Sequence, residues 1–180
     1  AIGCDDPVCL SDNPRNKRLR PSIVIQTSEF TLLVDTSPDL RQQALKHGLR
    51  KIDAVVYTHF HADHTFGIDD LRVFNMIMKR TIPCYAYENT LKILNQNFQY
   101  IFGQNNQHKG FKPRLTLNQI EDDLFEAANF NIIPIELDHA GTKVMGIRIG
   151  DFVYATDCSS ISESSLKKMQ GVKTLIIDAL

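Results

Sequence analysis

The stretch that decides the fold reads Ile52-Asp-Ala-Val-Val-Tyr-Thr-His-Phe-His-Ala-Asp-His64. Its first half is a nearly unbroken apolar run of strand length, which is typical of a strand covered on both faces. That strand leads directly into the pattern His-x-His-x-Asp-His, so three of the six histidines of the protein lie between His59 and His64. A buried strand that ends in clustered imidazoles favours an α/β protein with a functional site at the end of its sheet.

The side chains of this cluster have the donor chemistry of a metal site. On an extended segment, residues i, i+2 and i+4 share a face, so we expect His59, His61 and Asp63 to converge while His64 turns across as the chain bends. Neutral imidazole and carboxylate suit zinc, manganese or iron. Four donors on one catalytic ion would leave no exchangeable position, and the cluster therefore predicts two metal ions.

Two metal ions need further donors, which we expect at the ends of later strands. His139 follows an apolar run that ends at Leu137, and Asp157 follows Phe152-Val-Tyr-Ala-Thr156. Polar residues at strand exits commonly form the sites of α/β proteins. A carboxylate such as Asp157 can bridge two cations that share a hydroxide nucleophile. Asp138 belongs to the opposite face of the strand from His139 and is expected at the surface.

Around the cluster, strand-like and helix-like segments alternate along the chain. Residues 22–27 and 30–35 predict a hairpin, and Ser37 is the expected N-cap of a helix that ends at Gly48. The further segments with helical or strand periodicity are 69–78, 82–86, 89–98, 130–137, 144–149, 152–155, 162–169 with Ser162 as its cap, and a final buried strand over 173–180. Two successive sets of strands and helices predict a single domain over 1–180, built as a layered α/β sandwich.

Composition excludes several classes of protein. The 180 residues are 43% hydrophobic, which suits a globular domain and not a disordered chain. Lys and Arg number 20 against 21 Asp and Glu, so no overall field attracts nucleic acid or an anionic membrane. No apolar run approaches the roughly 18 residues that a membrane span requires. The 4 cysteines are too few for a disulfide framework, and we expect a soluble, cytoplasmic protein.

In order and spacing, Thr58-His-x-His-x-Asp-His64, His139 and the Asp157 of Ala-Thr-Asp-Cys resemble the metallo-β-lactamase superfamily. The N-terminal segments Gly3-Cys-Asp-Asp-Pro-Val-Cys9 and Pro-Arg-Asn-x-Arg-x-Arg-Pro-Ser22 resemble its branch that contains phosphoribosyl 1,2-cyclic phosphate phosphodiesterase. The resemblance implies an αββα four-layer sandwich. It also implies a first strand before residue 1 and a segment after residue 180, so we expect the polypeptide to continue beyond both ends.

The resemblance also implies how the donors are divided. One metal is held by His59, His61 and His139, the other by Asp63 and His64, and Asp157 bridges them. The same resemblance makes Asp63 and Asp157 the catalytic carboxylates, and it expects Asp35 and Thr58 to support the ligands from behind. A further histidine ligand and the acid for the leaving group are expected beyond residue 180.

The N-terminal loop contains two additional candidate sites. The branch has Cys-x-Cys-x-x-Cys for a structural zinc, and the corresponding residues here are Cys4, Asp6 and Cys9. The loop therefore predicts either an additional structural zinc or two thiols with no ligand role. The basic candidates that follow are Arg15, Arg18 and Arg20. Their guanidinium groups suit phosphate capture if the loop folds toward the metals, and otherwise they form a solvated surface.

Together these features predict a dinuclear metal hydrolase that cleaves a phosphodiester through a metal-bridging hydroxide. The expected partner is a small phosphorylated substrate, cyclic nucleotide-like or a sugar phosphate, with selectivity from the polar segment 103–114. The alternatives are hydrolysis of a thioester, a lactam or a tRNA 3′ end on the same fold, and a non-hydrolytic carrier. Nucleic acid is not the expected partner because only residues 15–20 offer a basic run. The sequence leaves a homodimer open.

Overall fold

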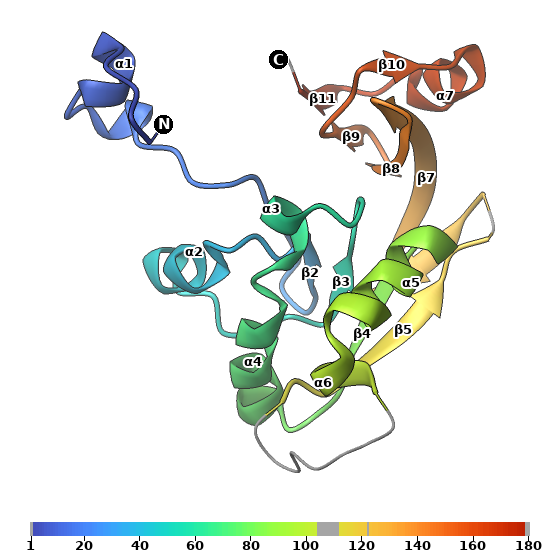
Figure 1. Ribbon diagram of the computed structural model, residues 1–180. Coiled ribbons are helices and arrows are strands. Elements are labelled where there is room, and N and C mark those ends of the chain that lie inside the picture. The colour runs from blue at the N-terminus through green and yellow to red at the C-terminus, as the bar shows by residue number, and fades with distance from the viewer. Residues whose placement is uncertain (1, 104–111, 122, 179–180) are drawn as a thin grey trace.

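The computed structural model describes residues 2–103, 112–121 and 123–178, and in it two β-sheets pack face to face with helices on their outer sides (Figure 1). The strands of the first sheet follow in the order β1 (Ile23–Gln26), β2 (Thr31–Val34), β3 (Ala54–Val56), β4 (Ile82–Ala86) and β5 (Leu115–Gln119). The first two strands form the predicted antiparallel hairpin. Every later pair in this sheet is parallel.

The second sheet is mostly antiparallel. Its order is β10 (Ser160–Ile161), β7 (Phe130–His139), β8 (Thr142–Ile149), β9 (Phe152–Ala155) and β11 (Thr174–Ile177), with β6 (Phe125–Ala127) also paired to β7. The predicted strand segments 144–149 and 152–155 are confirmed, and β8 and β9 pair antiparallel on either side of Gly150-Asp151. Only β11 runs parallel to its neighbour, β9.

Short helices connect and cover the strands. They are α1 (Pro7–Leu10), η1 (Pro14–Asn16), α2 (Leu40–His47), α3 (Ala62–Thr65), η2 (Ile68–Asp70), α4 (Leu71–Met78), α5 (Glu88–Asn97), α6 (Gln99–Phe102) and α7 (Glu163–Met169). Gly48 ends α2 in the left-handed conformation, as predicted. The predicted cap of α7 is confirmed, since the Ser162 hydroxyl accepts a hydrogen bond from the amide of Ser165.

The predicted cap of α2 is wrong. The helix begins at Leu40 with Asp39 at the cap position, because Pro38 and Asp39 form a turn first. The Ser37 side chain is fully buried and donates a hydrogen bond to Gln43 Oε1. The Ser37 side chain therefore contacts the helix at the Gln43 side chain and does not occupy the cap position.

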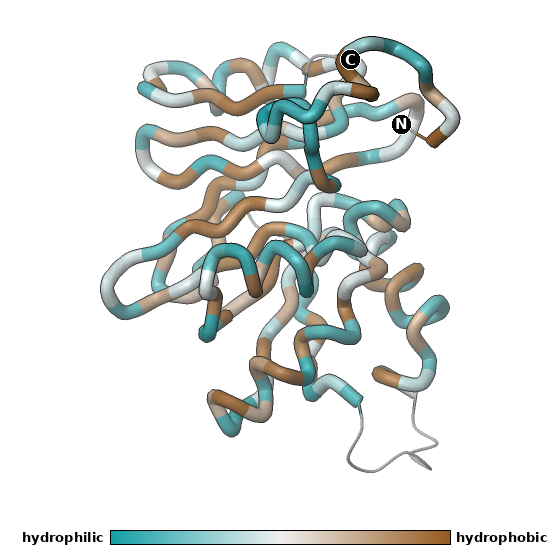
Figure 2. Tube along the Cα trace, turned by 90° about the vertical axis from the view of Figure 1, so that its left-hand side faces the viewer, coloured by the Kyte–Doolittle hydropathy of each residue, from teal (hydrophilic) through white to brown (hydrophobic). Residues whose placement is uncertain are grey.

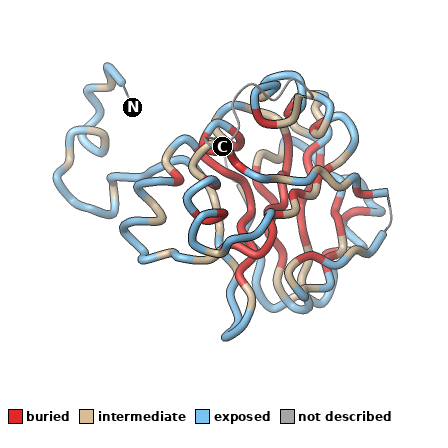
Figure 3. The backbone as a smooth tube through the Cα atoms, turned by 90° about the horizontal axis from the view of Figure 1, so that it is seen from below, coloured by how far each residue is buried: buried red, intermediate tan, exposed pale blue. Residues whose placement is uncertain are grey.

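Strand alternation sorts the core into three apolar layers. Leu33 and Val55 face the helices α2, α4 and α5, whereas Leu32 and Val34 face the second sheet. On the far side of the second sheet, a further cluster that includes Met169 packs beneath α7. Apolar and polar residues alternate along the chain (Figure 2), and the buried residues occupy the centre of the molecule (Figure 3). This arrangement confirms the predicted four-layer sandwich.

Some elements differ from the sequence-based expectation. Strands β5 and β6 were not predicted. The final strand was expected to be buried, but its residues Leu175, Ile176 and Ile177 are 47%, 45% and 44% exposed. Among the described strands, β11 pairs only with β9 and lies at the edge of its sheet, which leaves its side chains open. The segment predicted to provide selectivity, 103–114, lies largely outside the described residues.

Candidate metal centre

The predicted donors come together where strand ends of the two sheets meet. His59 and His61 follow β3 and lead into α3, which carries His64. His139 is the last residue of β7, and Asp157 follows β9. The two sheets are tied together beside the cluster, because the amide of Met145 on β8 donates to the carbonyl of Thr58 at 2.8 Å.

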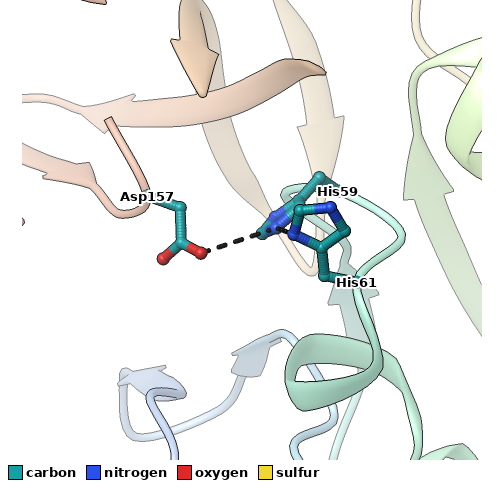
Figure 4. A group of neighbouring side chains, drawn as sticks. All are labelled: His59, His61 and Asp157. Atoms are coloured by element: carbon teal, nitrogen blue, oxygen red, sulfur yellow. Dashed lines mark hydrogen bonds and ion pairs between the residues drawn. The ribbon is translucent and has the colours of Figure 1, made fainter. Parts of the chain in front are cut away.

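The donor atoms approach one another closely. His59 Nε2 lies 2.9 Å from His61 Nδ1 and 3.6 Å from Asp157 Oδ2 (Figure 4). Asp157 Oδ2 also lies 3.3 Å from His64 Nε2 and 4.0 Å from His139 Nε2. Within the part of the chain that is described, one ligand atom from each of His59, His61 and Asp157 falls within 4.8 Å of the others. One carboxylate oxygen therefore faces three imidazole nitrogens.

Asp35 and Thr58 support the cluster from behind through short hydrogen bonds. Asp35 is fully buried after β2 and accepts three bonds, from Thr58 N, Thr58 Oγ1 and His64 Nδ1, each at 2.8 Å. Thr58 Oγ1 lies 3.0 Å from His59 Nδ1. Its hydrogen is already donated to Asp35, so it can only accept from His59.

These bonds assign the imidazole tautomers. His59 and His64 each carry a proton on Nδ1, so the Nε2 atom of each ring faces Asp157, where it can bind a metal ion or, in His64, a second proton. His64 Nε2 is buried and has no hydrogen-bond partner among the described residues. Bare lone pairs beside a carboxylate oxygen repel one another unless a cation or a proton lies between them. The residues present therefore fit a divalent metal that accepts imidazole and carboxylate donors.

The pKa values of the cluster reflect the same electrostatics. Burial, reinforced by the positive charge of His64, lowers the pKa of His59 to about 3, so this ring is neutral. Burial alone would lower the pKa of His64, but Asp157 and Asp35 outweigh it and raise that pKa to about 10. The close approach of His64 lowers the pKa of Asp157, whereas burial raises that of Asp35. The negative charge of the two carboxylates thus favours a cation at His64.

Asp63 lies near the cluster because the chain is helical there, and not because of the predicted extended alternation. The extended alternation holds for His59 and His61, but Asp63 lies within α3. Its Oδ2 is 3.9 Å from His64 Nε2 and 3.7 Å from a guanidinium nitrogen of Arg20. The helical turn therefore places Asp63 beside His64, with which it was predicted to share the second metal.

The remaining predicted residues lie on an arm that extends away from the sheets (Figures 1 and 3). Asp6 accepts a hydrogen bond from Val8 N and caps α1. Among the described residues, Asp6, Cys4 and Cys9 do not form a group of three possible metal donors. A side-chain hydrogen bond with Cys9 lowers the pKa of Cys4. The zinc site of this loop stays a prediction.

Of the basic candidates on the arm, Arg20 reaches the centre. Its amide donates to Asp39 Oδ2 at 2.8 Å, and its carbonyl accepts from Gln43 Nε2 at 2.8 Å. The start of α2 thus anchors the end of the arm, and the guanidinium lies beside Asp63. Arg15 and Arg18 contact each other, through Arg18 Nε and the Arg15 carbonyl.

Sequence reasoning missed two residues that organise the site. Thr36 accepts a hydrogen bond from the Gly67 amide and donates its own amide to the His64 carbonyl, at 2.9 and 2.8 Å. It thereby ties α3 to the end of β2. The Thr156 hydroxyl donates to Asp157 Oδ1 at 2.8 Å. The available signal was position, because Thr156 directly follows β9, Thr36 lies two residues after β2, and each is next to an aspartate.

Comparison with known proteins identifies the family to which this chain belongs. The family model described as a beta-lactamase superfamily domain matches residues 31–180. A solved structure described as a new diphosphatase from the PhnP family is 38% identical, with a TM-score of 0.89 over 99% of this chain and 67% of that one. Zinc-bound PqqB from Methylobacterium extorquens is 22% identical, with a TM-score of 0.70 over 98% of this chain and 64% of that one, and this likeness shows the fold alone.

One curated relative is much longer than this chain. An octanoyltransferase of Porphyromonas gingivalis is 34% identical over 181 residues, which cover 99% of this chain and 36% of that protein. The chain therefore spans about a third of the length of this relative. No helix in the described residues combines the length and the apolar character needed to cross a membrane.

Proposed function

We propose, on the premise that this chain belongs to the beta-lactamase superfamily and has the metallo-β-lactamase fold of that hydrolase family, that it cleaves a phosphoester bond at two divalent cations. The main support is that the Nε2 atoms of His59 and His64 face Asp157 Oδ2, and that His64 Nε2 is buried and has no hydrogen-bond partner in the described part of the chain. Such a donor set suits zinc, manganese or iron.

Each residue of the cluster has a proposed role. One cation would be held by His59, His61 and His139, the other by Asp63 and His64, and Asp157 would contact both. When bound, the two cations supply a hydroxide nucleophile near neutral pH and neutralise charge on the phosphoryl oxygens. Asp35 and Thr58 keep the tautomers fixed, so the lone pairs need no reorganisation during the reaction.

A small phosphorylated substrate is favoured by the charge on the rim of the centre. Arg20 is held there by its backbone, and its side chain is 64% exposed, so the guanidinium is available to an anion. A guanidinium matches phosphate oxygens in geometry and charge. The similarity to a diphosphatase over 67% of its chain also supports a phosphorus-containing substrate.

Two kinds of bond remain candidates within this class. A phosphodiester, cyclic nucleotide-like or a sugar phosphate, is our first proposal. A diphosphate bond is the second, and the diphosphatase at 38% identity specifically favours it. The name of the octanoyltransferase belongs to a protein of which this chain matches only 36%. We therefore propose no acyl transfer for this chain.

The test is hydrolysis by the purified protein after loading with zinc or manganese. The substrates are bis(p-nitrophenyl) phosphate, cyclic nucleotides, a cyclic sugar phosphate and a nucleoside diphosphate sugar, with a thioester and a lactam beside them. We expect turnover of at least one phosphorus ester, and its loss in His61→Ala. His47→Ala is the matched control, because His47 is exposed on α2. Cleavage of only the thioester or the lactam would contradict the proposal, and metal binding without any turnover would favour a carrier.

A further inference from the structure

The two oxygens of the Asp157 carboxylate have different surroundings. Oδ2 faces His64, His59 and His139 at 3.3, 3.6 and 4.0 Å from their Nε2 atoms. Oδ1 is turned away and accepts a hydrogen bond from the hydroxyl of Thr156 at 2.8 Å. In Figure 4 the carboxylate accordingly presents one oxygen to His59.

Nothing intrinsic to aspartate distinguishes these two oxygens. The terminal torsion of an aspartate is broad and roughly two-fold, so a carboxylate that nothing restrains turns freely between equivalent orientations. Asp157 also has a φ of 50°, in the left-handed region that aspartate adopts more readily than most residues, and this does not restrain the carboxylate torsion. A neighbouring bond is therefore needed to hold the carboxylate in one orientation.

Thr156 supplies that bond from a fixed position. It directly follows β9, is 7% exposed, and lies one residue from the carboxylate that it contacts. A β-branched side chain has few rotamers, so its hydroxyl stays aimed at Oδ1. With the hydroxyl hydrogen on Oδ1, only Oδ2 is directed at the imidazoles.

We infer that Thr156 is a positioning residue that holds the Asp157 carboxylate in the orientation in which Oδ2 faces the imidazoles of the centre. The inference rests on the proposed function, because it needs two cations at the cluster. It goes further by naming what fixes the shared ligand.

The test compares Thr156→Val with Thr156→Ser. Valine keeps the branched shape and removes the hydroxyl, whereas serine keeps the hydroxyl. We expect valine to weaken the binding of at least one manganese ion by about 10- to 100-fold, as loss of a supporting hydrogen bond commonly does. Serine should restore most of the affinity. Thr116→Val on the exposed face of β5 is the matched control, and it should leave manganese binding unchanged.

Two readouts separate positioning from packing. Manganese titration followed by electron paramagnetic resonance reports the coupled ion pair, and we expect its signal to be lost in the valine variant and kept in the serine variant. Far-UV circular dichroism and thermal unfolding of the metal-free proteins report folding, with Thr156→Ala as the second variant if valine does not fold. In an Asp157→Asn background, the valine change should have little further effect on manganese affinity.

The outcomes for this inference differ from those for the proposed function. If the unaltered protein binds two manganese ions and hydrolyses a phosphorus ester, but Thr156→Val binds both ions equally well, the positioning role is wrong and the proposed function stands. Equal loss in the serine and valine variants would also overturn it, since packing and not the hydroxyl would then matter. An unaltered protein that binds fewer than two ions would overturn both.

Discussion

Replacing Asp35 by asparagine is the sharpest perturbation of the support behind the metal centre. The Asp35 carboxylate accepts three hydrogen bonds, two of them on Oδ2, from Thr58 Oγ1 and His64 Nδ1. An amide has one acceptor oxygen, so its NH2 group must face at least one of these donors. The best orientation keeps the two bonds on the oxygen and leaves the buried Thr58 amide without a partner.

Two free energies follow from this geometry. One unpaired buried N–H costs about 1–3 kcal/mol of the free energy of unfolding. Burial raises the pKa of Asp35, which means that its charge is itself costly, so we expect the loss of stability at the lower end of that range. No similar gain offsets the loss of metal affinity, because in the variant the ligand His64 no longer has a negatively charged partner on its Nδ1 side. A decrease of about 10- to 100-fold is expected for metal binding, equal to about 1.4–2.7 kcal/mol.

The assay is competition for zinc with a chromophoric chelator, alongside urea unfolding of the metal-free protein. Asp138→Asn is the matched control, because Asp138 is exposed and next to His139 on the other face of the strand. Zinc binding by Asp35→Asn as tight as that of the unaltered protein would contradict the supporting role of Asp35. That role is equally contradicted if the exposed Asp138→Asn weakens zinc binding as much.

Three further predictions concern the whole centre. Removal of metal by a chelator should lower the melting temperature reversibly, because free metal at 100 times its dissociation constant stabilises the native state by about 2.7 kcal/mol; calorimetry with and without added zinc checks this. Gly67→Ala should destabilise the protein by about 1–3 kcal/mol in urea unfolding, since its Cβ would lie 2.0 Å from the Ser37 carbonyl oxygen; unchanged stability would contradict this. Arg20→Ala should raise KM for a phosphorylated substrate more than it lowers kcat, whereas Arg41→Ala on the outer face of α2 should change neither; steady-state kinetics distinguishes these outcomes.

Much of the fold could be predicted from short runs of apolar residues in the sequence. The apolar run before Thr58 predicted β3, and the strands ending near His139 and Asp157 were located from their own apolar runs. Strand β6 was missed because its three residues, Phe125-Glu-Ala127, lie in no apolar run and are too few to show alternation. The exposure of β11 among the described strands could not be read from its sequence either, because apolar content does not reveal how a strand is covered by its neighbours.

The donors of the site were predictable, and their geometry was not. The residue types and spacing of His59, His61 and His64 indicated a metal centre without any structure. The helical placement of Asp63 depends on the bonds of α3 to Thr36, which join segments far apart in the sequence. Thr156 was missed because a threonine beside an aspartate is common, and only its contact with Oδ1 distinguishes it.

The most direct test is anomalous diffraction from crystals of this protein grown with zinc or manganese. We predict two anomalous peaks about 3.5–4 Å apart. They should lie among the six donors His59, His61, Asp63, His64, His139 and Asp157. A pocket without anomalous peaks after soaking in excess divalent salt, with the imidazoles turned apart, would contradict the account.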